Sequence, residues 1–281
     1  AKPSASTNSP NAQARKLTTR PPAASLPAQK IAALPSATVL RIPAGSFWMG
    51  STTRDKFRFV KETPKHKVTL TTAFLAWKSE VTQKQYKTVM KTNPSRFQKC
   101  GGQCPVERVS WHDAALFANT LSKLEKKPAC FVCKSGKCSL AAAYQKGNVH
   151  KCKGWRLPTE AEWEYMAWAG TSSAGKDKFA GVAMSKRNIN ASTLPVQKSD
   201  SNTWGLLGMK TTVFEWTLDY KYRKYSTQAV TNPIQSIPAA MRVMRGGCWF
   251  LVMWKTRISC REWMLPTTRS HLVGFRPVRS L

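Results

Sequence analysis

Acidic residues are scarce in this chain of 281 residues, which carries 14 Asp and Glu against 45 Lys and Arg, a formal net charge of +31. Such a field attracts anionic partners: nucleic acids, acidic glycans, lipopolysaccharide or anionic lipids. The basic residues are spread along the chain, however, with no arginine-lined helix, RNP-type aromatic motif or zinc-finger spacing. These absences argue against specific recognition of nucleic acid and leave anionic polymers as possible partners of the basic surface.

Histidines are few, and the short motifs of common catalytic sites are missing. The four histidines, His66, His112, His150 and His271, have no spacing typical of an iron-binding facial triad. We expect His112, in the first turn of a predicted helix, to be solvated or hydrogen-bonded. The absence of GxSxG, P-loop and HExxH sequences argues against the enzyme classes that these motifs define. No apolar run approaches the ~20 residues of a membrane-spanning helix, and residues 1–36 hold no apolar signal-peptide segment.

Composition divides the chain into a tail and a folded domain. Residues 1–36 are rich in Ala, Ser, Pro and Thr, which predicts a disordered tether. From Ala37 to residue 281 the sequence is typical of one globular domain, with 11 Trp in the whole chain and no internal repeat. Residues 171–204 predict a long Ser- and Gly-rich loop.

Three helices and several short strands are predicted, which indicates an α+β domain rich in loops. The helices lie at 80–91, 109–125 and 157–170, with Thr82, Ser110 and Thr159 as N-caps and Gly170 ending the third. Strands are predicted at 37–51 (two, around a turn at 43–45), 66–77, 212–220, 242–249, 257–262 and 273–278.

Eight cysteines fall into three groups: Cys100 and Cys104; Cys130, Cys133, Cys138 and Cys152; and Cys248 and Cys260. A disulfide easily closes the short loop CGGQC. The middle four predict either two disulfides or a zinc site, although only Cys130 and Cys133 have the CxxC spacing of zinc ligands. We favour disulfides, which indicate an oxidising compartment such as the periplasm, the cell surface or the extracellular space.

The C-terminal stretch GGCWFLVMWKTRISCREWMLPTTRSHLVGFR, residues 246–276, mixes apolar clusters with charges. One interpretation is a core strand with Phe250, Val252 and Trp254 on one face. Leu251 and Met253 on the other face are also apolar, however, and a strand buried on both faces is unexpected beside so many charges. We therefore favour an exposed apolar cluster, which usually marks a binding site.

Eight blocks, in order, resemble the formylglycine-generating enzyme (sulfatase-modifying factor) domain: IPAGSFWMGS, EVTQKQY, PVERVSWHDAALFANTLS, WRLPTEAEWEYMAWAG, NTWGLLGM, VFEWTLD, RVMRGGCW and GFRPV. The resemblance covers residues 38–279, and RLPTEAEWEY is highly specific. It implies a C-type lectin fold with few helices and short antiparallel strands.

The residues that the resemblance implies for catalysis are replaced. The catalytic members place two copper-binding cysteines where this chain has Leu251 and Thr256, so we expect no copper. The places implied for calcium hold Gly208, Thr211 and Thr212, and Glu215 alone is a poor site for this ion, so calcium is not expected. We expect Glu215 to be structural and the chain not to be an enzyme. The alternative is an enzyme of the formylglycine-generating and sulfoxide-synthase superfamily with an unrecognised site.

The pattern within residues 245–278 also resembles the variable proteins of diversity-generating retroelements, which use this fold. Scaffold residues stand where the family places them: Arg245, Gly246, Gly247, Trp249, Arg257, Arg261, Arg269, Gly274, Phe275 and Arg276. The residues between them share no chemistry and are interpreted as variable, ligand-binding positions on a solvent-facing surface: Cys248, Phe250, Val252, Met253, Trp254, Lys255, Cys260, Glu262, Trp263, Met264, Thr268, Ser270, His271 and Leu272.

The resemblance implies a non-catalytic display protein, exported and held at the cell surface or outer membrane by its N-terminal linker, as in a lipoprotein. Its expected partner is a protein or glycan ligand on another cell or surface, and we expect a monomer. The further alternative is an envelope-associated structural module that binds anionic polymers.

Overall fold

The structure of the chain is a computed structural model and describes residues 28–30, 37–170, 192–210, 212–222, 224–249 and 256–281. Among these residues there are three α-helices: α1 (Gln83–Met90), α2 (Trp111–Leu124) and α3 (Glu160–Trp168). All three begin at the predicted N-caps, because Thr82, Ser110 and Thr159 each form a capping box with the residue at N3. The helix α3 ends at Trp168, and Ala169 is its left-handed C-cap, one residue before the predicted Gly170.

The strands form four sheets. A five-stranded sheet has the order β1-β2-β5-β14-β8, with β1 (Ala28–Lys30), β2 (Thr38–Ile42), β5 (Phe74–Trp77), β14 (Val278–Ser280) and β8 (Trp155–Arg156). A three-stranded sheet has the order β10-β4-β3, with β10 (Val230–Thr231), β4 (His66–Leu70) and β3 (Gly45–Met49). A four-stranded sheet has the order β12-β11-β9-β13, with β12 (Arg261–Met264), β11 (Arg242–Arg245), β9 (Phe214–Tyr220) and β13 (Val273–Gly274).

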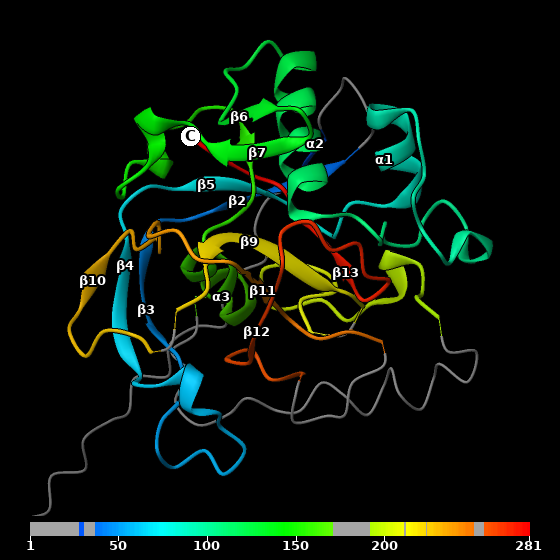
Figure 1. Cartoon of the computed structure of the whole chain (residues 1–281). Helices are drawn as coiled ribbons and strands as arrows, with labels where there is room; N and C mark the ends of the chain where they lie inside the picture. Colours follow the sequence, from blue (N-terminus) through cyan, green and yellow to red (C-terminus); the bar gives the residue numbers. More distant parts are fainter. Residues whose placement is uncertain (1–27, 31–36, 171–191, 211, 223, 250–255) are drawn as a thin grey trace, which may run out of the picture.

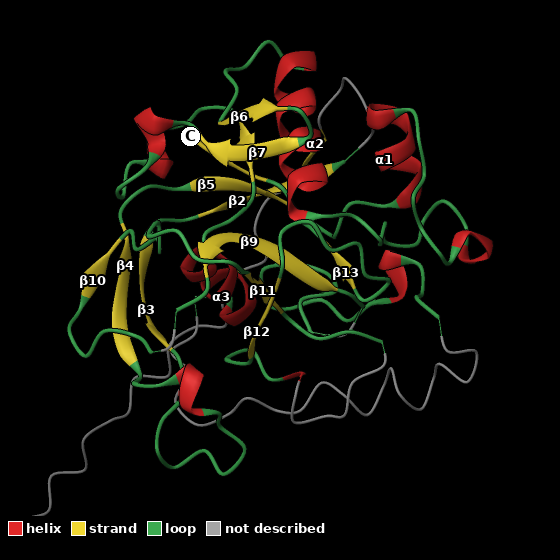
Figure 2. Ribbon diagram, viewed as in Figure 1, coloured by secondary structure: helices red, strands yellow, loops and turns green. Residues whose placement is uncertain are grey.

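The fourth sheet pairs β6 (Phe131–Lys134) with β7 (Lys137–Leu140). All described pairs are antiparallel except β10 with β4 and β13 with β9, which are parallel. Short 3-10 helices complete the described elements: η1 (Val60–Glu62), η2 (Gln98–Cys100), η3 (Ala142–Tyr144), η4 (Val149–Lys151) and η5 (Val196–Lys198). Figures 1 and 2 show α1 and α2 at one end of the molecule and the loop between β3 and β4 at the opposite end.

Aromatic side chains fill the core between the helices and the five-stranded sheet. Trp77 on β5 packs edge-to-face against Phe117 of α2 and Trp155 of β8, at centroid distances of 5.9 and 6.2 Å. Tyr86 of α1 stacks on Phe117, and Phe275 closes the cluster. All of these side chains are buried. The burial of large aromatic surfaces is the main favourable contribution to the stability of such a domain.

Several predicted boundaries need correction. The strand β1 pairs with β2, so the folded part includes residues 28–30, which we expected within the tether. The predicted strand 66–77 is two strands in different sheets. The predicted strand 273–278 is likewise β13 and β14, with Phe275, Arg276 and Pro277 between them. Residues 1–27, 31–36 and most of the predicted loop at 171–204 lie outside the described residues, so the tether stays a prediction there.

The predicted strand 257–262 begins only at Arg261. Residues 257–260 form a turn in which the Cys260 amide donates to the Arg257 carbonyl oxygen at 2.9 Å. The guanidinium of Arg245 also donates to the Ile258 carbonyl oxygen at 2.8 Å, which helps to hold this turn in place. The sequence pattern alone gave no sign of this tertiary hydrogen bond.

The disulfide prediction is confirmed over the zinc alternative. Cys100 is bonded to Cys104, Cys130 to Cys152 and Cys133 to Cys138. The amide of Cys138 donates to His112 Nδ1 at 3.0 Å, so this histidine is hydrogen-bonded as expected. Cys248 and Cys260 are buried and stand outside these three disulfides. No helix of the described part is long and apolar enough to cross a membrane.

Candidate ligand-binding surface

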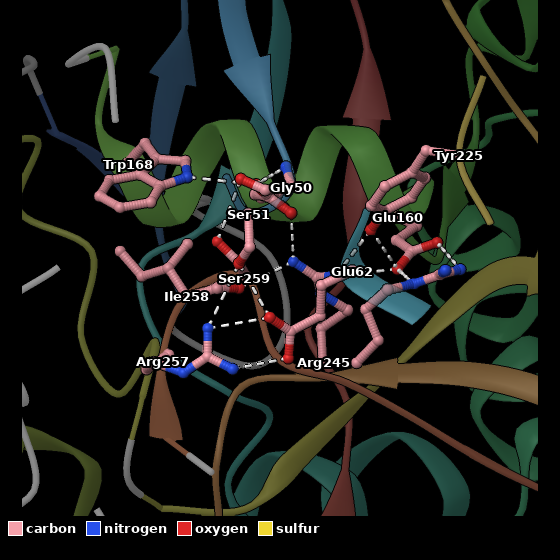
Figure 3. Close-up of polar contacts among 12 residues, drawn as sticks. Gly50, Ser51, Glu62, Glu160, Trp168, Tyr225, Arg245, Arg257, Ile258 and Ser259 are labelled. Atoms are coloured by element: carbon pink, nitrogen blue, oxygen red, sulfur yellow. Dashed lines mark hydrogen bonds and ion pairs between the residues drawn. The ribbon is translucent and has the colours of Figure 1, made fainter. Parts of the chain in front are cut away.

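Three buried arginines of the C-terminal segment (residues 245–278), Arg245, Arg257 and Arg261, fix its position. Figure 3 shows the contacts of Arg245 and Arg257. Arg245, at the end of β11, forms ion pairs with Glu160 and Glu164 of α3, at 2.8 Å to Glu160. Arg261, the first residue of β12, contacts both carboxylate oxygens of Glu160. The two arginines therefore attach β11 and β12 to the same helix. Charge pairing of this kind is needed because an isolated buried guanidinium would be very costly.

The carboxylates of α3 are matched to these arginines. Burial alone raises the pKa of Glu160, but the charges of Arg261 and Arg245 outweigh it and hold this pKa below its usual value. Glu164 also accepts hydrogen bonds from the Gly50 amide at 2.8 Å and from the Trp168 indole at 3.2 Å (Figure 3). All residues of α3 are buried, so the helix acts as an internal support for the C-terminal segment.

Arg257 connects the C-terminal segment to the loop after β3. Its guanidinium forms ion pairs with Glu62 at 2.7 Å and Asp55 at 2.8 Å, and donates to the Phe57 carbonyl oxygen at 2.8 Å. Ser51 also donates to Glu62 at 2.8 Å (Figure 3). Burial raises the pKa of Glu62, while Arg257 acts in the opposite direction. Arg257, which we predicted to be a scaffold residue, is buried in these contacts, and its partners come from a loop about 200 positions earlier in the sequence.

Arg276 occupies the region that the family resemblance implies for calcium. Its guanidinium contacts Glu215 at 2.8 Å and Glu80 at 3.7 Å, and all three side chains are buried. Thr212 donates to the Glu80 carboxylate. Burial, with the neighbouring charge of Glu215, raises the pKa of Glu80 to about 8, although Arg276 lowers it. Glu215 is therefore structural, as predicted, and a guanidinium already provides the positive charge at these carboxylates.

Two scaffold glycines permit close backbone contacts. A Cβ on Gly247 would lie 2.2 Å from the Lys210 carbonyl oxygen and 2.8 Å from the methyl group of Thr256. A Cβ on Gly274 would lie 2.6 Å from the Val106 carbonyl oxygen. Any larger residue at these positions would displace the backbone, which explains glycine here. Thr256, at the place of the second catalytic cysteine, is itself buried.

The remaining scaffold residues, Gly246, Trp249 and Arg269, differ in their environments. Gly246 has φ +87°, which ends β11 in a conformation that favours glycine. Trp249 is half-buried and packs against Phe97 and His271, at centroid distances of 5.3 and 5.8 Å. Arg269 is exposed and forms an ion pair with Asp113 at 2.8 Å.

The predicted variable residues separate into three groups. The central ones lie outside the described residues: Phe250, Val252, Met253, Trp254 and Lys255. A second group is half-buried at the surface: Glu262, Trp263, Met264, Thr268, Ser270, His271 and Leu272. For Cys248 and Cys260 the expectation of a solvent-facing side chain is wrong, because they are 2% and 1% exposed. Cys248 belongs to the main core cluster, and burial raises the pKa of the Cys260 thiol to about 12.

Trp263, on the edge strand β12, has a cationic environment that the sequence did not predict. The ammonium groups of Lys61 and Lys221 lie 4.4 and 4.6 Å from the indole, in cation–π contact. Lys61 also pairs with Glu262 at 2.7 Å. Only the folded chain brings Lys61 and Lys221 to this strand. In the sequence, the mixture of basic and aromatic residues in RDKFRFVK, at 54–61, was the available sign that the loop after β3 could take part in binding.

The chain belongs to the family of the sulfatase-modifying factor enzyme 1-like domain, whose model matches residues 24–281. The predicted fold class is thereby confirmed as the α+β, C-type lectin-like fold of this family. Within the described residues, no group of three or more His, Cys, Asp or Glu side chains is arranged to hold a metal ion.

One solved structure is similar over nearly the whole chain. Variable protein 1 of Treponema denticola is 26% identical, with a TM-score of 0.74 over 91% of this chain and 99% of that protein. The predicted resemblance to a variable protein is therefore confirmed.

Curated relatives match at similar identity but over smaller shares. The chain is 28% identical over 205 residues to chaperone protein LppX of Paenibacillus barcinonensis, covering 63% of this chain and 69% of that protein. It is 28% identical over 193 residues to the formylglycine-generating enzyme of Streptomyces coelicolor, covering 61% of this chain and 51% of the enzyme. It is 26% identical over 211 residues to serine/threonine-protein kinase pkn1 of Chlamydia pneumoniae, covering 70% of this chain and 29% of the kinase.

Proposed function

We propose that this chain is a non-catalytic display protein whose C-terminal surface binds macromolecular ligands and is diversified by a retroelement. The observation that carries the proposal is the similarity to variable protein 1 of Treponema denticola across almost the full length of both chains. The arrangement of the C-terminal segment supports it. Arg245, Arg257 and Arg261 are buried in ion pairs, whereas Glu262, Trp263 and Met264 reach the surface.

This division of roles suits a surface that must change without unfolding the protein. The buried arginines attach the segment through side chains that do not vary in this proposal. β12 is an edge strand of its sheet, and its residues Glu262, Trp263 and Met264 are half-buried, with Met264 packed against the rim of the core. Surface substitutions away from the core usually change stability by less than about 0.5 kcal/mol.

The absence of catalysis and of cofactors belongs to the same proposal. Thr256 provides no thiolate for copper, and its methyl group lies against Gly247. Arg276 provides a positive charge between Glu80 and Glu215, which disfavours a calcium ion at these carboxylates. Copper or iron retained at one ion per chain after purification would overturn this part and favour an enzyme of the same family.

Location and partners are proposed on chemical grounds. Three disulfides support export to an oxidising compartment, at the cell surface or outer membrane. The predicted linker, which the pairing of β1 with β2 shortens to the residues before Ala28, would hold the domain away from that surface, as in a lipoprotein. We propose a monomer that binds a protein or glycan ligand on another cell or surface.

The test compares tolerance to substitution at two sets of three positions. A library randomised at Glu262, Trp263 and Met264 should yield mostly folded protein, since these side chains lie at the surface. A matched library at Arg245, Arg261 and Phe275 should yield mostly unfolded protein, since these side chains are buried. The share of variants that resist protease measures the share of folded protein in each library. Equal loss of folded protein in the two libraries would contradict a surface built to vary.

Natural variation gives the second test. Sequences of this locus from sister isolates should differ mainly within about residues 248–272. A template repeat near the gene should carry adenines at the positions that differ. Uniform differences along the chain would contradict the retroelement.

A further inference from the structure

The loop of residues 52–62, here called the basic loop, lies beside β12 and is held by the same arginines. Arg257 donates to the Phe57 carbonyl oxygen and pairs with Asp55 and Glu62. Arg261 donates to the Lys61 carbonyl oxygen at 2.6 Å. The basic loop is therefore attached to the C-terminal segment through two of its buried arginines. Figure 1 shows it extending beyond the lower ends of β3 and β12.

The outward side chains of the basic loop alternate between cationic and apolar. Arg54, Lys56 and Arg58 are exposed. Phe57 lies between the last two cations and Val60 follows them in the sequence, and these apolar side chains are 47% and 69% exposed. The basic loop therefore exposes an aromatic and a β-branched side chain among cations. This is the general composition of a protein interface.

The carboxylates near this surface already form ion pairs, whereas three exposed cations of the basic loop do not. Asp55 and Glu62 pair with Arg257, and Glu262 pairs with Lys61. Within the described part of the chain, Arg54, Lys56 and Arg58 form no ion pair with a carboxylate. Arg58 instead donates to the carbonyl oxygens of Thr53 and Asp55. The basic loop thus presents a local positive charge that favours an acidic partner.

The basic loop is continuous with the candidate variable surface. Lys61 belongs to the loop, pairs with Glu262 and lies 4.4 Å from the Trp263 indole. Lys221 lies 4.6 Å from the same ring and extends the positive charge across β12. A partner that covers Trp263 would therefore also meet the cations of the loop.

We propose that the basic loop is a fixed half of the binding surface and receives an acidic, aromatic-bearing segment of a protein partner. Carboxylates of the partner face Arg54, Lys56 and Arg58, and an apolar side chain contacts Phe57 and Val60. This inference rests on the proposed display function and names the chemistry of its partner. The fixed half supplies attraction common to all ligands, while β12 supplies discrimination.

A protein fits better than a bilayer because the apolar group is small. Phe57 and Val60 are the only large exposed apolar side chains of the basic loop, and Lys61 and Lys221 lie against the indole of Trp263. Insertion into a membrane interface usually involves a broader apolar face than two side chains.

The experiment measures binding of the full chain to a random copolymer of glutamate and tyrosine. The variant R54Q/K56Q/R58Q should bind at least about tenfold more weakly, and F57S/V60S at least about threefold more weakly. A matched charge control, K84Q/K87Q/K127Q, removes three exposed cations near α1 and α2. A matched apolar control, L124S/V132S, removes two exposed apolar side chains elsewhere. Both controls should stay within about twofold of the original chain.

Several outcomes would overturn the proposal. Equal weakening by K84Q/K87Q/K127Q would assign the binding to the overall charge. Stronger loop-dependent binding to heparin, or to vesicles of phosphatidylglycerol and phosphatidylcholine, would assign the loop to a glycan or a membrane. In each case the substitution libraries at β12 would still report separately on the display function.

Discussion

At the residue scale, the buried arginines determine which parts of the C-terminal segment can change. Arg245, Arg257 and Arg261 each combine ion pairs with hydrogen bonds to backbone carbonyl oxygens. These bonds join segments that are far apart in the sequence. Buried ion pairs contribute little net stability compared with apolar packing, but losing one partner is costly because the other charge stays buried. Such residues therefore tolerate substitution poorly.

The substitution Arg245→Met should lower the free energy of unfolding by about 3–5 kcal/mol, because it leaves Glu164 buried without its guanidinium. Urea denaturation followed by tryptophan fluorescence measures the change. The matched control is Arg269→Gln, which breaks the exposed pair with Asp113 and should cost less than about 1 kcal/mol. Similar losses in the two variants would show that the buried cluster does not hold the segment.

At the element scale, local signals located the helices well and the C-terminal strands poorly. Each helix starts with a capping box that the sequence displays directly. In contrast, β12 begins four residues later than predicted, because a tertiary hydrogen bond from Arg245 holds the preceding turn. Helix capping is a local interaction, whereas strand boundaries depend on which neighbours are present.

The helix α1 provides a matched pair of threonines for testing the cap. Thr82→Ala should lower stability by about 1 kcal/mol, since it removes the acceptor of the Gln85 amide. Thr88→Ala, within the same helix, should be neutral or stabilising by up to about 0.7 kcal/mol, because alanine has the higher helix propensity. Thermal unfolding monitored by circular dichroism compares the two. A larger loss for Thr88→Ala would contradict the capping role.

At the scale of the whole molecule, three disulfides close loops, two of them around β6 and β7 and the third at η2. The bond between Cys130 and Cys152 closes a separation of 22 residues, whereas that between Cys100 and Cys104 closes 4. A crosslink removes more conformational entropy from the unfolded chain when the closed loop is longer. The longer bridge should therefore contribute more to stability.

Replacing Cys130 and Cys152 together by alanine should lower the free energy of unfolding by about 3 kcal/mol. The same replacement of Cys100 and Cys104 should lower it by about 2 kcal/mol under identical oxidising conditions. Calorimetric unfolding of both variants provides the values. The reverse order would mean that native packing around CGGQC outweighs the entropy of the longer loop.

The sequence by itself predicted the family, the fold class, the three helix starts and a preference for disulfides over zinc at the middle cysteines, but not which cysteine is bonded to which. These follow from local patterns: capping residues next to apolar periodicity, cysteine spacing and family blocks in order. It also predicts a variable surface on the C-terminal segment, because scaffold residues such as Gly247 and Gly274 are interleaved with residues of no common chemistry.

Only the tertiary structure decided which of those residues reach solvent and what surrounds them. Cys248 and Cys260 looked variable in the sequence but are buried, because Cys248 packs in the core and Cys260 lies at the turn after Arg257. Lys61 and Lys221 reach Trp263 from other parts of the chain. Burial and charge environment are properties of contacts between distant segments, and no local pattern in the sequence encodes them.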